Sequence, residues 1–265
     1  MVSSDFATKF LKLAKSDKNI VSFIFLLRQK RFMWRLKMDS GNIGFVLLCA
    51  AFVFVMTPGL AMFYGGLVRK KNVVNTMMTS IFIIGIGIVM WVLFGYSLSF
   101  APSGNAFIGD FRWLGLEGVS LTEGYTDDAS IPNMVFSAFQ MMFAMITPAL
   151  ITGAVAGRMK FKSIFVFTIF WSLIVYYPLS HMVWGQGGLL GADGIGALDF
   201  AGGDVVHISS GVSALVLCIL LGKRHDYEHS IYRIHNIPKV VLGASLLMFG
   251  WFGFNAGSAL AADGL

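Results

Sequence analysis

One ionisable side chain lies inside an otherwise uncharged segment of the chain. His207 follows Asp204-Val-Val and precedes Ile-Ser-Ser-Gly, so small and apolar residues surround it. An imidazole exchanges a proton near neutral pH, and its neutral form offers one hydrogen-bond donor and one acceptor. Because an ionisable group inside an apolar span is costly, its presence indicates a functional site. The alternative is a packing histidine that bonds a neighbouring backbone carbonyl.

A second group of candidates combines aromatic rings with a hydroxyl. Trp184 lies in a glycine-rich stretch from His181 to Gly203, Phe143 closes Phe139-Gln-Met-Met-Phe, and Ser258 adds a polar atom to an apolar run. Aromatic faces at an outer mouth attract a small cation by about 0.5–2 kcal/mol each. Taken singly, each ring also suits an interfacial belt or a packed core. His181 itself ends an apolar run, so we expect it in a wet or interfacial position.

Uncharged runs of membrane-spanning length must position these residues. Six of them lie at about 43–68, 77–101, 132–157, 163–181, 203–221 and 240–262. A helix of about 20 apolar residues crosses the hydrocarbon core of a bilayer. The chain is 56% hydrophobic and only 13% charged, against about a quarter charged in soluble domains. The sequence therefore predicts an all-α fold, a polytopic transmembrane helix bundle.

Nothing in the sequence indicates an enzyme. It contains no HExxH, no GxSxG and no paired carboxylates inside the apolar runs, and Cys49 and Cys218 are far from any metal-binding spacing. His225, His229 and His235 share a charged connection without further ligands, which is weak support for a metal. We therefore expect no catalytic residue, no metal and no cofactor.

Charge alternates along the connections between the runs. Basic residues follow the first, third and fifth runs, whereas the connection after the second has a net charge of −4. The positive-inside rule then places the N-terminus of residues 38–265 outside the cell membrane.

Residues 1–37 oppose this topology, because nine basic residues against two acidic ones give them a net charge of +7. We interpret 1–37 as a basic leader upstream of the true start at Met38; a retained leader or signal, and a functional basic arm, are the alternatives. The remaining 228 residues have a net charge of −1, so no nucleic-acid partner is indicated.

Four sequence motifs indicate a family resemblance. They are Thr57–Asn72 (TPGLAMFYGGLVRKKN), His181–Gly185 (HMVWG), Leu198–Ile208 (LDFAGGDVVHI) and Gly250–Ser258 (GWFGFNAGS). In this order they closely resemble the ammonium transporters of the Amt/Mep/Rh family, over about Asp39 to Leu265. Family members resemble two inverted repeats of five helices plus a final helix. The resemblance therefore implies that 38–265 is the N-terminal portion, the first repeat of five helices plus the sixth helix.

The resemblance also implies a role for individual residues. Phe143, Trp184 and Ser258 match the external ammonium-recruitment site, and Phe143 and Phe254 match a stacked phenylalanine gate below it. Asp199 matches a carboxylate that supports the recruitment site. His207 matches the first of two pore histidines, and Trp251 matches a residue along the hydrophobic path. Asp204 stands where some relatives carry threonine. The second pore histidine and the other pore wall are absent, so we expect this chain alone to be inactive; completion by a second chain is the alternative.

The function implied by the family is transmembrane transport of ammonium and ammonia in nitrogen uptake. Ammonium is held at the outer mouth and gives up its proton, while ammonia crosses an apolar conduit past the pore histidine. The implied partners are the lipid bilayer, a homotrimer in the full-length protein, and a PII-type regulatory protein at the cytoplasmic face. A membrane ammonium sensor with the same fold is one alternative. A Rh-like gas channel is another, although it would depart from Trp184 and Ser258.

Overall fold

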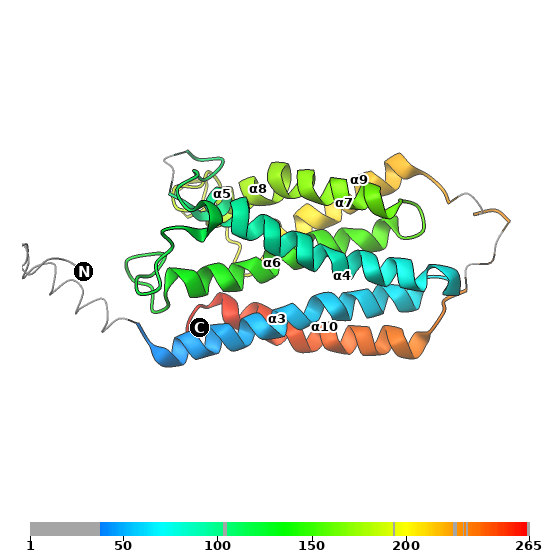
Figure 1. Cartoon of the computed structure of the whole chain (residues 1–265), viewed down its shortest axis with the longest axis horizontal. Helices are drawn as coiled ribbons and strands as arrows, with labels where there is room; N and C mark the ends of the chain where they lie inside the picture. Colours follow the sequence, from blue (N-terminus) through cyan, green and yellow to red (C-terminus); the bar gives the residue numbers. More distant parts are fainter. Residues whose placement is uncertain are drawn as a thin grey trace, which may run out of the picture.

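The computed structural model describes residues 38–102, 105–192, 194–224, 227–229, 231 and 233–263, so the leader proposed at 1–37 lies outside the described residues. Within them, helices run back and forth along one axis and no strand occurs (Figure 1). The elements are α3 (Ser40–Leu67), η1 (Lys70–Asn72), α4 (Val73–Met90), η2 (Trp91–Gly95), α5 (Tyr96–Phe100), η3 (Leu114–Leu116), α6 (Asn133–Val155), α7 (Phe161–Trp171), η4 (Ser172–Tyr176), α8 (Tyr177–Trp184), η5 (Gly203–Ile208), α9 (Ser209–Leu221) and α10 (Ile237–Ser258). The all-α prediction is confirmed.

Six of these helical stretches are long and apolar enough to cross a membrane, namely 40–67, 70–100, 133–155, 161–184, 203–221 and 237–258. Three of them contain a π-helical segment, η2, η4 or η5, which continues directly into the α-helix that follows. We call the end of the bundle at which α5, α8 and α10 finish the outer end, following the predicted orientation. The connections 101–132 and 185–202 lie at this end (Figure 1).

The predicted boundaries differ from the observed ones where polar residues belong to the helices. The fourth span continues past 181 to Trp184, so Trp184 ends a helix and does not lie in the glycine-rich connection. The last span begins at Ile237, where the Asn236 side chain accepts a hydrogen bond from the Lys239 amide and caps the helix. It ends at Ser258, and Leu260 has a φ of +59° that a helix does not accommodate.

The core of the bundle is formed around α6. In the most hydrophobic 18-residue stretch of α6, 67% of the residues are buried. The corresponding share is 22% in the span 203–221, which includes α9, and 22% in α10. Aromatic rings fill the space around its outer half; the fully buried ones include Trp91, Tyr96, Phe100, Phe139, Phe143, Tyr176, Tyr177 and Phe254. Since α9 and α10 each leave one long face uncovered, His207 and Trp251 are exposed on that side.

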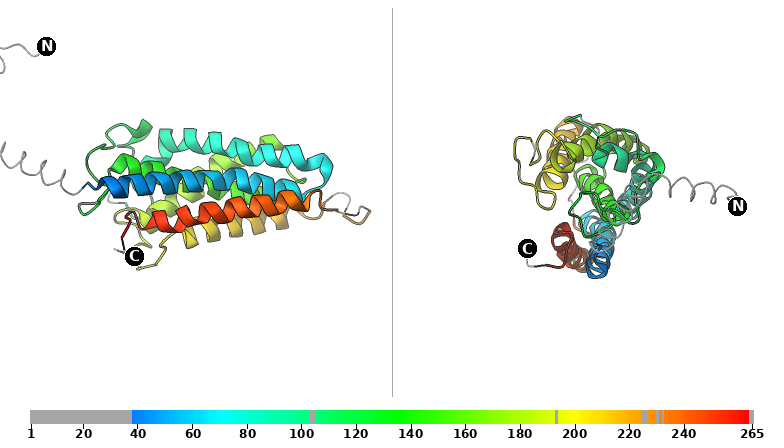
Figure 2. Two further views of the ribbon diagram at one scale, coloured as in Figure 1. Left: turned by 90° about the horizontal axis from the view of Figure 1, so that it is seen from below. Right: turned by 90° about the vertical axis from the view of Figure 1, so that its left-hand side faces the viewer.

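Helices α3 and α10 pack against each other along most of their length (Figure 2). The close approach depends on a row of glycines on α10, because any added Cβ would collide with α3. At Gly250 a Cβ would lie 2.2 Å from Met56 Cγ, and at Gly253 it would lie 2.7 Å from the Cys49 carbonyl oxygen. Small residues at helix interfaces are typical of membrane proteins, where packing and not hydrophobicity drives association. This row fixes the height of Phe254 and Ser258 relative to the rest of the bundle.

Candidate functional site

Three side chains from three helices line one pocket at the outer end. Phe143 comes from α6, Trp184 from the last residue of α8 and Ser258 from the last residue of α10. The pocket has a volume of about 260 Å³. The structure therefore brings together the three residues that the sequence predicted would converge, although they are far apart along the chain.

The two rings of the pocket are held at a fixed angle. The centroids of Phe143 and Trp184 are 6.1 Å apart, and their planes are inclined at 78°. Trp184 Nε1 donates a hydrogen bond of 2.8 Å to the Asp199 carbonyl oxygen, which prevents the indole from turning. Because the negative face of an aromatic ring attracts a cation, this wall is suited to hold a small positive ion.

The Ser258 hydroxyl supplies the polar contact. Its Oγ donates a hydrogen bond of 2.8 Å to the Phe254 carbonyl oxygen, one helical turn earlier. With its hydrogen used in this way, the oxygen is left with acceptor lone pairs for a ligand. A ligand that carries only hydrogen-bond donors would therefore find an acceptor at this position.

A column of stacked rings continues from the floor of the pocket. Phe143 and Phe254 are each only 1% exposed, and their centroids lie 4.6 Å apart. Next to them, the His207 ring stacks at 5.7 Å from Phe254 and at 5.3 Å from Trp251. Phe143 lines the pocket and Phe254 packs against it, so the imidazole lies on the far side of both rings.

The Asp199 carboxylate organises the backbone that leads to His207. Its Oδ1 accepts hydrogen bonds from the Gly202 and Gly203 amides, and its Oδ2 accepts from the Asp204 and Val205 amides at 2.8 and 3.0 Å. These are the free N–H groups at the start of η5, where a negative charge is favourable. Both carboxylate oxygens are therefore used to hold the backbone between Gly202 and Val205.

One sequence-based expectation about this region is wrong. His181 was expected in a wet or interfacial position, but its side chain is fully buried, with 0% exposed. Its Nδ1 lies 3.1 Å from the Ser99 carbonyl oxygen, and its Nε2 lies 2.8 Å from that of Asn105. A neutral imidazole donates its one N–H to one of these two oxygens, so the polar ring has a partner inside the bundle, where it lies between α8 and the end of α5.

Several lining residues were not predicted from the sequence, among them Gln140 and Tyr125. Gln140 lies one turn before Phe143 on α6, and Tyr125 comes from the long connection before that helix. An amide within the apolar run of α6 was a usable signal for Gln140. Tyr125 gave none, because the connection 101–132 has no periodic pattern.

Two further observations concern the ionisable groups of the described residues. In the outer connection, the Arg112 guanidinium holds the pKa of Asp110 below its ordinary value through a hydrogen bond of 2.7 Å. Among the residues that the structure describes, no three His, Cys, Asp or Glu side chains are grouped to hold a metal ion. His225 lies outside that part of the chain.

Comparison with known proteins gives a consistent result. The family model described as the Ammonium Transporter Family matches residues 44–265. An ammonium transporter of Bacillus subtilis is 52% identical over 228 residues, which cover 86% of this chain and 55% of the relative.

The fold is also similar to solved structures. The crystal structure of Candida albicans Mep2 is 33% identical with a TM-score of 0.76, over 87% of this chain and 50% of that one. A structure described as a sensor Amt protein is 30% identical with a TM-score of 0.73, over 84% and 56% of the two chains. The chain thus spans about half the length of the relatives it matches.

Proposed function

This chain belongs to the ammonium transporter family, and we propose that it forms the recruitment site and one wall of the pore of a transporter for ammonium and ammonia. The six apolar spans make it a multi-pass membrane protein. In this proposal, Phe143, Trp184 and Ser258 bind ammonium at the outer end. The two rings contribute cation–π attraction of about 0.5–2 kcal/mol each, and the Ser258 oxygen accepts one N–H.

Passage beyond the pocket requires the ion to lose its proton. The Phe143–Phe254 stack is apolar and closed, so a charged ion cannot be solvated there, whereas neutral ammonia can cross when the rings swing aside. Ammonium therefore separates into ammonia and a proton at the gate. Ammonia continues past His207 and Trp251, while the proton moves separately by way of the pore histidine. The net movement of charge makes transport electrogenic.

One observation carries this proposal: the residues of the pocket, the gate and the pore follow one another through direct ring contacts. Ser258 and Phe254 are adjacent turns of α10, Phe254 contacts Phe143 at 4.6 Å, and His207 contacts Phe254 at 5.7 Å. Unlike the packed rings elsewhere in the core, this series begins at the pocket that contains Trp184 and Ser258 and ends at an ionisable side chain. The series is ordered in the way that recruitment, dehydration and conduction require.

The family resemblance extends the proposal to the native protein as a whole. We infer a homotrimer with the N-terminus of residues 38–265 outside, and a PII-type regulator at the opposite face. In support, the connections at the other end of the bundle carry Arg69, Lys70, Lys71, Arg158, Lys160, Lys162, Lys223 and Arg224. This distribution agrees with the positive-inside rule.

A sensor role is the second candidate, favoured by the similarity to a sensor Amt protein. A sensor needs the same recruitment pocket but not a high rate of conduction. Ammonium binding with little current, together with a signalling output, would identify it.

Ammonium-evoked current in proteoliposomes that contain the native protein tests the proposal. We expect current with ammonium and none with potassium. His207→Ala should change the current or its coupling to protons, whereas His235→Ala, in the connection between α9 and α10, should leave it unchanged. Absence of ammonium current in the native protein, or equal effects of the two substitutions, would contradict the transport mechanism.

A further inference from the structure

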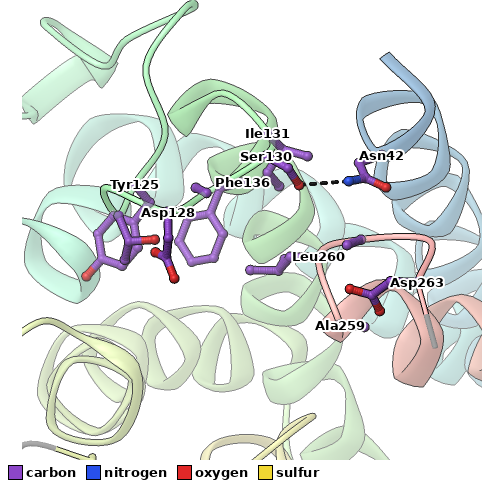
Figure 3. Close-up of a pocket in the computed structure, with 12 residues that line it drawn as sticks. Asn42, Tyr125, Asp128, Ser130, Ile131, Phe136, Ala259, Leu260 and Asp263 are labelled. Carbon is purple, nitrogen blue, oxygen red and sulfur yellow. Dashed lines mark hydrogen bonds between the residues drawn. The ribbon is translucent and has the colours of Figure 1, made fainter. Parts of the chain in front are cut away.

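Tyr125 lies at the boundary between two outer pockets. It lines the pocket of about 260 Å³ that contains Phe143, Trp184 and Ser258. It also lines a neighbouring pocket of about 450 Å³, which extends toward the start of α3 and the end of α10 (Figure 3). Phe136, Thr126 and Leu260 are shared by the two pockets as well. The side chains on this boundary decide whether the two spaces are separate or continuous.

The Tyr125 ring is held firmly in place by aromatic neighbours. It lies parallel to Phe136, with centroids 4.8 Å apart and an interplanar angle of 3°. Its other neighbour, Phe100, meets it edge-on at 5.5 Å. Figure 3 shows the Tyr125 and Phe136 rings together on one side of the larger pocket, with Leu260 farther along it. Because both contacts come from helices of the bundle, the ring is a fixed wall although it belongs to a long connection.

Hydrogen bonds join Tyr125 to the segment that carries Trp184. Its hydroxyl accepts a bond of 3.0 Å from the Gln186 amide, and its carbonyl oxygen accepts one of 2.9 Å from Gln186 Nε2. Gln186 follows Trp184 by two residues, so the wall and the indole are tied to the same short stretch of backbone. Burial raises the pKa of the Tyr125 phenol, which keeps it a neutral hydroxyl at physiological pH.

We propose that Tyr125 is a specificity-determining residue, which closes the recruitment pocket on its outer side and limits the size of the ammonium ion that binds there. The inference rests on the proposed function and adds a residue that sets selectivity among ammonium ions. With Tyr125 in place, the cation site is confined to the smaller pocket. Without the ring, the space extends into the larger pocket, and alkylammonium ions with an added carbon or two no longer meet a wall.

Selectivity between ammonium and ethylammonium tests this proposal. In the native protein, the ratio of half-saturating concentrations for the two ions is measured from proteoliposome currents. One methylene group changes the discrimination between two substrates by about 10–200-fold in an apolar pocket. We therefore expect Tyr125→Ala to lower the discrimination against ethylammonium by about tenfold. Tyr125→Phe retains the ring and should stay within about twofold of the native ratio.

Two further variants test whether the change in selectivity depends on the boundary between the two pockets. Trp113→Ala removes another aromatic ring of the same connection, which stacks on Tyr96 and lines neither pocket; it should leave the ratio unchanged. Thr126→Phe adds bulk on the shared boundary and should increase discrimination against ethylammonium, which provides a test even if Tyr125→Ala does not fold. An unchanged ratio in folded Tyr125→Ala, an unchanged ratio in Thr126→Phe, or an equal loss in Trp113→Ala overturns the proposal.

Binding separates this inference from the transport proposal. Binding of the same two ions to the purified protein is measured by titration calorimetry, without any need for current. A protein that binds both ions but conducts neither refutes transport, and the binding ratio of the Tyr125 and Thr126 variants then decides the inference. A native protein that neither conducts nor binds ammonium overturns both.

Discussion

Replacement of Asp199 by asparagine separates a structural role from direct binding of the cation. The aspartate accepts four backbone N–H groups, two on each oxygen. An asparagine retains one oxygen for one pair, and turns an NH₂ group toward the other pair. Two hydrogen bonds to a charged acceptor are lost, and donors then face donors.

The size of the effect follows from these bonds. A hydrogen bond to a charged group contributes about 1.5–3 kcal/mol, so the loss of two amounts to about 3–6 kcal/mol. Asp199 is half-buried, and water replaces part of the loss, so we expect a decrease of about 3 kcal/mol in the free energy of unfolding. At about 2–4 °C for each kcal/mol, the midpoint of thermal unfolding should fall by about 6–12 °C.

Thermal unfolding and ammonium binding are measured on the same purified variants. We expect Asp199→Asn to lower the unfolding midpoint and to weaken both ammonium binding and current, because Trp184 and His207 both depend on this segment. Asp204→Asn makes the same change of charge five residues later, where the side chain does not hold these amides, and serves as the control. If Asp199→Asn weakened binding with no loss of stability, the carboxylate would bind the cation directly and our reasoning would be refuted.

Three further substitutions have expected outcomes. Trp184→Leu removes one cation–π contact and should raise the half-saturating ammonium concentration about 2–30-fold in the native protein; a change in maximal current alone would argue against a recruitment role. Gly257→Ala places a Cβ 2.6 Å from Phe139 Cε2 and 2.7 Å from Cys49 Cβ, so it should cost about 1–3 kcal/mol by overpacking. Gly44→Ala, with open space around it, should not lower the unfolding midpoint, because alanine is the better helix former; a fall equal to that of Gly257→Ala would contradict the packing account. His181→Leu removes the hydrogen bond that the ring N–H donates to one of the two carbonyl oxygens and should lower the unfolding midpoint, at about 1–3 kcal/mol for the lost bond; an unchanged midpoint would count against this.

The spans were predictable because hydrophobicity alone decides them. Uncharged runs of sufficient length located all six, although the predicted ends differ from the observed ones by up to seven residues. The errors occurred where a polar side chain finds its partners inside the bundle. His181 is the clearest case, since the sequence shows its polarity but not the two carbonyl oxygens that receive it.

The site was predictable in part, for a different reason. Phe143, Trp184, Ser258 and His207 belong to motifs with a family resemblance, and the structure places them as neighbours. Tyr125 belongs to no motif and comes from a connection without periodicity. Its position depends on contacts with Phe136 and Gln186, which only the folded chain reveals.

The π-helical segment η5 places one more residue in the turn held by Asp199 than a regular α-helix would. In this segment the His207 amide donates to the Gly202 carbonyl oxygen, five residues back. Because the wider turn absorbs the additional residue, the helix that follows keeps its register. Deletion of Val205 would remove both the additional residue and one of the four amides that the Asp199 carboxylate accepts. A homologue with a one-residue gap at this point in an alignment therefore has to hold the start of this helix by other contacts, even where every motif residue is retained.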